Sequence, residues 1–90
     1  MIPLFDCHCD TISRVMNEGG SLRKNGFHTD LERLRKFVPC SQVFALCTET
    51  HEHSIEKAEA MLRRLNRQIE ENSDIVMLCL NFHDIKEAAD

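Results

Sequence analysis

The stretch Leu4-Phe5-Asp6-Cys7-His8-Cys9-Asp10-Thr11 places ionisable side chains at the end of a short apolar run. The run over residues 2–9 is typical of a buried strand, and it ends at Asp10. Alternate side chains of a strand share a face, so Asp6, His8 and Asp10 are predicted to point one way. Polar groups on one face of an apolar strand are costly unless they have a use. This strand end is therefore the first place to look for function.

An imidazole and a carboxylate two residues apart can converge on one metal ion. His8 and Asp10 are candidate metal ligands, because both residue types bind Zn²⁺ or similar ions. The alternative is that both side chains hydrogen-bond backbone groups, with Asp10 capping the following helix. A zinc site that uses the thiolates of Cys7 and Cys9 is a weaker alternative, since alternation sets both cysteines opposite the histidine.

The rest of the chain alternates between helix and strand patterns. Helices are predicted over about residues 10–16, after a capping box of Thr29 with Glu32, from Ser54 to about residue 72, and from Asp84 onward. Strands are predicted over residues 41–48 and 75–80. This order predicts an α/β fold with parallel strands. The long helix is expected to face the core with Ile55, Ala58, Leu62, Leu65 and Ile69.

Length and composition set the broad class. The chain has 90 residues, of which 42% are hydrophobic and 29% charged, and a formal net charge of −4. These values are typical of one small soluble domain, and the acidic balance argues against nucleic-acid binding. No apolar run approaches the roughly 20 residues that span a bilayer. Without a signal peptide, the five cysteines are expected to be free thiols in the cytoplasm, with Cys47 and Cys79 buried.

Three segments resemble the membrane (renal-type) dipeptidases. Residues 4–11 are similar to that family's first strand, whose motif reads Asp-Gly-His-Asn-Asp, although Cys7 and Cys9 replace its Gly and Asn. Residues 27–34, Phe-His-Thr-Asp-Leu-Glu-Arg-Leu, resemble its His-Thr-Asp/Asn-Leu/Ile-x-x-Leu segment. Residues 41–44, Ser-Gln-Val-Phe, resemble its Gly-Gln-Phe-Trp/Phe strand. The three segments also follow the family's order.

The resemblance implies a fold and an activity. The fold would be a metal-dependent-hydrolase-type (β/α)8 TIM barrel, and residues 1–90 would be its incomplete N-terminal portion, since such barrels need roughly 250 residues. The activity would be zinc-dependent hydrolysis of dipeptides, with His8 and Asp10 binding one of two Zn²⁺ ions. The family's other metal ligands, a bridging Glu and two His, would lie further along, so this piece alone is expected to be inactive.

Two other interpretations stay open. The chain could be a stand-alone, non-catalytic α/β interaction module, or a small Cys/His metal-binding module. A thin parallel sheet exposes apolar faces and edges, which predicts self-association into homo-oligomers. The remaining histidines favour structural roles: His28 beside a helix start, His51 and His53 in a polar loop, and His83 in a turn.

Overall fold

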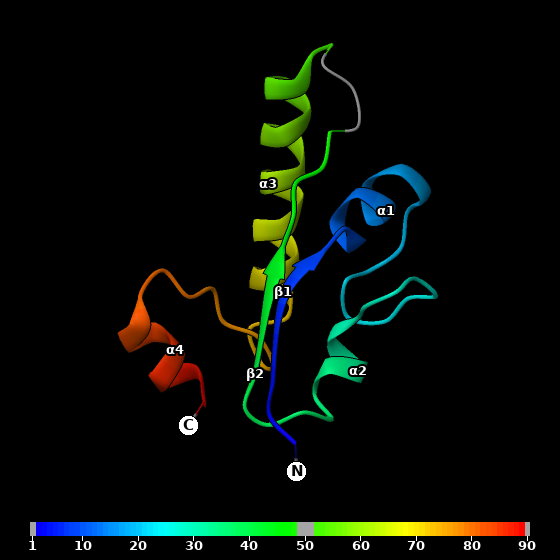
Figure 1. The fold of residues 1–90 in the computed structure, drawn as a ribbon. Helices are drawn as coiled ribbons and strands as arrows, with labels where there is room; N and C mark the ends of the chain where they lie inside the picture. The colour runs from blue at the N-terminus through cyan, green and yellow to red at the C-terminus, as the bar shows by residue number, and fades with distance from the viewer. Residues whose placement is uncertain (1, 49–51, 90) are drawn as a thin grey trace.

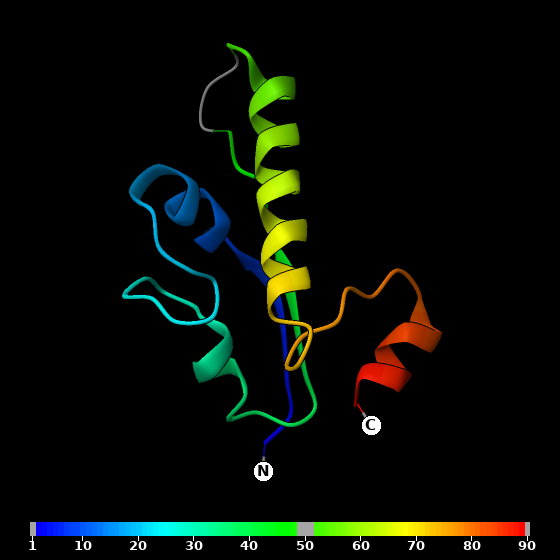
Figure 2. The ribbon, with the colours of Figure 1, turned by 180° about the vertical axis from the view of Figure 1, so that it is seen from behind.

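A computed structural model describes residues 2–48 and 52–89, which form a small mixed α/β domain. Its elements are β1 (Leu4–Cys9), α1 (Thr11–Glu18), α2 (Leu31–Leu34), β2 (Cys40–Phe44), α3 (Ser54–Glu71) and α4 (Phe82–Ala89). The two strands lie side by side and parallel, and α3 runs along one face of them (Figures 1 and 2). In this part of the chain, no helix is long and apolar enough to cross a membrane.

Parallel pairing of β1 with β2 decides what each face of the small sheet carries. Asp6 and Gln42 are register partners on the face that meets α2. On the opposite face, Phe5 and Val43 are 62% and 47% exposed, so that face is open. The register shifts between Asp6 and Cys9, and pairing resumes at the end of β1, where Cys9 lies opposite Phe44. The predicted parallel α/β arrangement is therefore confirmed for two strands.

The core lies between α1, α3 and the loop that joins α1 to α2. Leu22 in that loop has no exposed surface, and its burial contributes about 1.5–3 kcal/mol. Its backbone N–H donates to Oε1 of the buried Gln68 on α3 at 2.8 Å, so the loop is fixed to α3. The buried apolar side chains of the core are Ile12, Val15, Leu22, Leu31, Met61 and Leu65.

The buried face of α3 differs from the predicted stripe. Leu65 is buried as expected, but Ile55 and Leu62 are 70% and 46% exposed, whereas Met61 and Gln68 are buried. The reason is that α3 packs mainly on α1, and the face of α3 that contacts α1 is rotated slightly from its apolar stripe. The prediction that the whole stripe faces the core was therefore wrong.

Residues 75–80 do not form the predicted third strand. The N–H groups of Ile75 and Val76 both donate to the carbonyl of Asn72, so the chain turns directly after α3. The segment then runs away from the sheet to α4, which lies apart from the strands (Figure 1). A strand needs a neighbour to satisfy its backbone, and this segment lies beside none in the described structure. β2 likewise ends at Phe44, earlier than predicted.

Candidate metal site at the end of the first strand

His8 and Asp10 come together where β1 passes into α1. His8 is the second-last residue of β1, and Asp10 occupies the N-cap position of α1. The Nε2 atom of His8 lies 3.2 Å from Oδ1 of Asp10. The two side chains are 66% and 53% exposed, so the pair is open to solvent. An imidazole nitrogen and a carboxylate oxygen thus converge at the carboxyl end of a strand, as the spacing predicted.

The carboxylate of Asp10 is not used by the helix that follows it. Asp10 makes no side-chain capping hydrogen bond, and Ser13 N–H donates to its backbone carbonyl at 3.0 Å. The interpretation of Asp10 as a side-chain helix cap was therefore wrong. The carboxylate instead contacts the imidazole of His8.

Asp6 does not join this pair, contrary to the expectation from strand alternation. Its Oδ2 accepts a hydrogen bond from Nε2 of Gln42 at 2.9 Å, and its Oδ1 accepts a long one, 3.4 Å, from the N–H of His8. The pairing register shifts between Asp6 and Cys9, so the alternation expected of a regular strand does not hold along this part of β1. No cluster of three or more metal-ligating His, Cys, Asp or Glu occurs among the described residues. The site thus consists of two donors.

The two neighbouring thiols differ in their surroundings. Cys9 is 8% exposed, and desolvation by burial raises the pKa of its thiol despite opposing hydrogen bonds from Thr11. Cys7 is exposed. One thiol is thus buried and the other exposed, whereas the side chains of His8 and Asp10 are both open to solvent.

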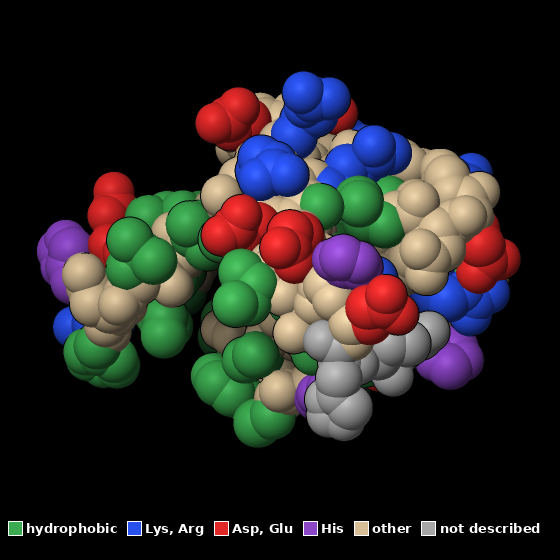
Figure 3. Space-filling model, turned by 90° about the horizontal axis from the view of Figure 1, so that it is seen from above, with side chains coloured by type: hydrophobic (Ala, Val, Ile, Leu, Met, Phe, Trp, Pro, Cys, Tyr) green, Lys and Arg blue, Asp and Glu red, His purple; other side chains and the backbone are tan. Residues whose placement is uncertain are grey.

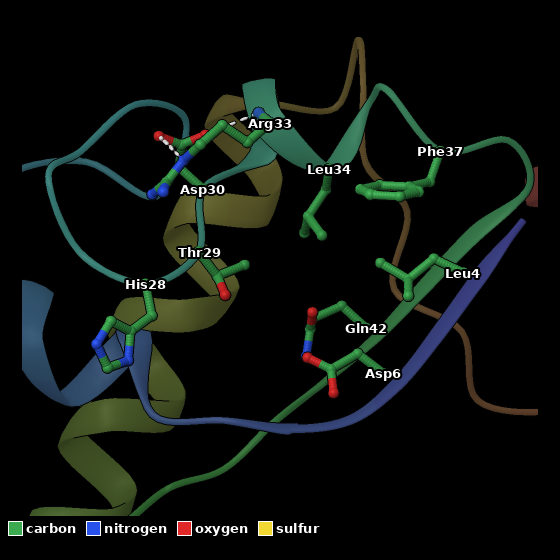
Figure 4. Close-up of a pocket in the computed structure, with 9 residues that line it drawn as sticks. All are labelled: Leu4, Asp6, His28, Thr29, Asp30, Arg33, Leu34, Phe37 and Gln42. Carbon is green, nitrogen blue, oxygen red and sulfur yellow. Dashed lines mark hydrogen bonds and ion pairs between the residues drawn. The ribbon is translucent and has the colours of Figure 1, made fainter. Parts of the chain in front are cut away.

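A cavity of about 230 Å³ lies between the strands and α2. Figure 4 shows Asp6 and Gln42 on its floor, with Leu4 beside Phe37 and Leu34 on its apolar side and His28 at the opposite end. The Oε1 atom of Gln42 is buried there without a hydrogen-bond partner. This volume is below the roughly 300–1,000 Å³ of most small-molecule sites.

The second His-x-Asp segment is structural, as predicted, but in a different way. Asp30, not Thr29, caps α2: its Oδ1 accepts from the Arg33 N–H at 2.8 Å, and the predicted capping box is absent. Its Oδ2 accepts from the Asn25 N–H at 3.0 Å and pairs with Nε of Arg33 at 3.2 Å. With both oxygens engaged and 3% exposure, Asp30 is unavailable to a ligand. His28 is exposed at the end of the cavity.

The other predicted features have mixed outcomes. His83 lies inside α4, where its Nε2 is 3.9 Å from Oε2 of Glu87, so its assignment to a turn was wrong. His53 is exposed just before α3, and His51 lies outside the described residues. Cys47 is exposed and Cys79 partly buried, because the strands predicted around them do not form there.

Comparison with known proteins adds no assignment. The chain matches no protein-family model, no curated protein sequence and no solved structure. The functional argument therefore depends on the residues and geometry described above.

Proposed function

We propose that this chain supplies the first metal-binding segment of a zinc-dependent dipeptidase. In this proposal residues 1–90 are the N-terminal portion of a TIM barrel of the metal-dependent-hydrolase type, and the substrate is a dipeptide. The ligands from this chain are His8 and Asp10. The observation that carries the proposal is the 3.2 Å contact between His8 Nε2 and Asp10 Oδ1 at the carboxyl end of β1.

Two further features support the proposal. Barrel enzymes place their chemistry at the carboxyl ends of parallel strands, which is where His8 and Asp10 lie. The hydrogen bond between Gln42 and Asp6 joins the two strand segments that resemble the dipeptidase motifs, so both motif residues have a structural use. Family resemblance and local geometry thus select the same strand end.

The two donors fit a zinc ion chemically but do not complete its coordination. Zinc is usually four-coordinate, and imidazole nitrogen and carboxylate oxygen are both common ligands. When bound, zinc would supply an activated water and polarise the peptide carbonyl. The role of His8 and Asp10 would be to hold the ion at the strand end, with the remaining ligands supplied from outside the described residues.

Zinc titration of the ¹⁵N-labelled chain tests the site. We expect the imidazole resonances of His8 to move first, and Asp10→Asn to weaken zinc binding by about tenfold or more. His83→Ala is the matched control, because His83 also lies beside a carboxylate but in α4, and it should leave zinc binding unchanged. Equal shifts at His8 and His83 would refute the assignment.

The activity is tested on the zinc-loaded product of the complete reading frame that carries this chain. We expect hydrolysis of unblocked dipeptides and its loss in His8→Ala, while His83→Ala stays active. Absence of dipeptide hydrolysis in a folded, zinc-loaded preparation would refute the dipeptidase proposal. Hydrolysis that His8→Ala leaves unchanged would refute the role of His8.

The open apolar surface favours a second candidate, a non-catalytic interaction module. The exposed face of the sheet carries Phe5 and Val43, and hydrophobic side chains gather on the separate lobe formed by α4 and the segment before it (Figure 3). Leu80 and Phe82 in that lobe are 80% and 73% exposed. Large exposed apolar patches mark interaction sites. Concentration-dependent oligomers in light scattering, without zinc binding at His8, would favour this candidate.

A further inference from the structure

A second cavity, of about 240 Å³, has an unusual set of donor atoms on its walls. Met16 reaches it from α1, Cys47 from the segment after β2, and Met61 from α3. Three separate parts of the chain therefore bring three sulfur-bearing side chains to one cavity. None of these residues belongs to the zinc site proposed above.

Ser13 links these elements at short range. Its hydroxyl donates to the carbonyl of Cys47 at 3.3 Å and lies 3.5 Å from Sδ of Met61. Met16 follows Ser13 by three positions on α1, and residues at that spacing lie on the same face of a helix. Ser13 thus holds the backbone of Cys47 and the thioether of Met61 next to the turn of α1 that carries Met16.

The three side chains differ in exposure in a way that suits an entering ion. Met61 is 5% exposed at the inner wall of the cavity, whereas Met16 is 38% exposed and Cys47 is exposed. The inner thioether is held in place by the core, and the two outer donors can be reached from solvent. A small ion can therefore enter without unfolding the domain.

The chemistry of the donors selects the ion. Thiolate and thioether sulfurs are soft ligands that favour Cu(I) over Mg²⁺ or Ca²⁺, and three sulfurs suit its low coordination number. We propose that Met16, Cys47 and Met61 form a binding site for one Cu(I) ion. On binding, the Cys47 thiol releases its proton to solvent and the thiolate coordinates the ion. The bound unit is then neutral, so it adds no positive charge beside Lys57, which lines the same cavity.

Silver(I) provides a redox-stable probe with the same ligand preference. The full chain, labelled with ¹³C at the methionine methyl groups, is titrated with one equivalent of Ag(I). We expect the methyl resonances of Met16 and Met61 to shift, while that of Met77, which lies outside the cavity, stays in place. Shifts at Met77 alone, or no shift at Met16 and Met61, would overturn the proposal.

Competition with a chromophoric Cu(I) chelator under anaerobic conditions measures the affinity. Cys47→Ser and Met16→Leu should each weaken Cu(I) binding by about 10–100-fold, the range seen when even second-shell support of a metal is lost. Cys79→Ser is the matched control, since Cys79 lies outside the cavity and should leave the affinity unchanged. Met16 is partly exposed, so Met16→Leu keeps the fold, which is checked by circular dichroism.

The alternative Cu(I) site in this chain is the Cys7-His8-Cys9 segment. Cys7→Ser separates the two, because it removes a thiol from β1 and leaves the cavity intact. Unchanged affinity in Cys7→Ser supports the proposal. Unchanged affinity in both Cys47→Ser and Met16→Leu overturns it.

Discussion

Replacement of Asp30 by Ala should destabilise the domain more than any neighbouring surface change. Asp30 is 3% exposed, and its Oδ1 accepts the Arg33 N–H at 2.8 Å as the N-cap of α2. Its Oδ2 accepts the Asn25 N–H at 3.0 Å. One carboxylate therefore closes the loop before α2 and starts the helix.

The cost follows from the two N–H groups that lose their acceptor. Loss of an N-cap costs about 0.5–2 kcal/mol. A buried N–H without a partner costs about 1–3 kcal/mol, and the Asn25 N–H is only partly buried, so the lower end applies. The sum predicts a loss of about 1.5–3 kcal/mol, a large share of the roughly 5–15 kcal/mol that stabilises a domain.

Urea unfolding followed by circular dichroism measures this loss. Thr29→Ala is the matched control, because only the backbone carbonyl of Thr29 forms a hydrogen bond, with Asn25 Nδ2, and the substitution keeps it. We expect Thr29→Ala to change the free energy of unfolding by about 0.5 kcal/mol or less. Equal losses in Asp30→Ala and Thr29→Ala would refute the assignment of Asp30 as the cap and restore the Thr29 capping box.

Three further predictions concern pH, packing and thiol chemistry. Burial raises the pKa of Asp30, but hydrogen bonds from the Asn25 and Arg33 N–H groups and the Arg33 charge outweigh it, so the pKa lies below its ordinary value of 3.8. As pH falls, the carboxyl of Asp30 is therefore protonated in the unfolded chain before it is protonated in the folded one. The stabilisation from Asp30 is complete above about pH 5 and is lost as pH falls through the folded pKa. Acid unfolding of the wild type, compared with that of Asp30→Asn, would detect this loss. Leu22→Ala should cost about 2–5 kcal/mol in urea unfolding, whereas Leu80→Ala, at an 80% exposed site, should change stability little. A thiol reagent should label Cys7 well before Cys9, because Cys7 is exposed and burial raises the pKa of the Cys9 thiol. Mass spectrometry of the labelled peptides gives the order of labelling. Earlier labelling of Cys9 would contradict the prediction.

The local part of the site could be predicted from sequence because it depends on neighbours in the chain. The two-residue spacing of His8 and Asp10 and the change from strand to helix are enough to bring them together. Asp6 is also two residues from His8, but its side chain bonds to another residue. Its partner is Gln42, 36 residues away, and only the pairing of β1 with β2 brings that amide to it.

The errors have a common physical origin: several local options fit the sequence pattern equally well, and side-chain contacts outside the pattern choose between them. Thr29 and Asp30 both carry an oxygen that can cap a helix, and the ion pair with Arg33 favours Asp30. Apolar residues of α3 lie on more than one face of the helix, and packing on α1 buries Met61 in place of Leu62. The sulfur cavity gives no sequence signal, since Met16, Cys47 and Met61 are far apart in the chain.

The exposure of the His8–Asp10 pair determines which kind of zinc site the proposal can describe. A structural zinc site is closed by four protein ligands and contributes to folding, whereas a catalytic site keeps a position open. Here the side chains of His8 and Asp10 are 66% and 53% exposed. The core that includes Ile12, Val15 and Leu22 contains neither of them. Under the zinc proposal, folding would not depend on the metal, so a chelator should leave the circular dichroism of this chain unchanged. In the proposed dipeptidase, this exposed pair would supply two ligands of an open site, which is the form that a catalytic metal requires.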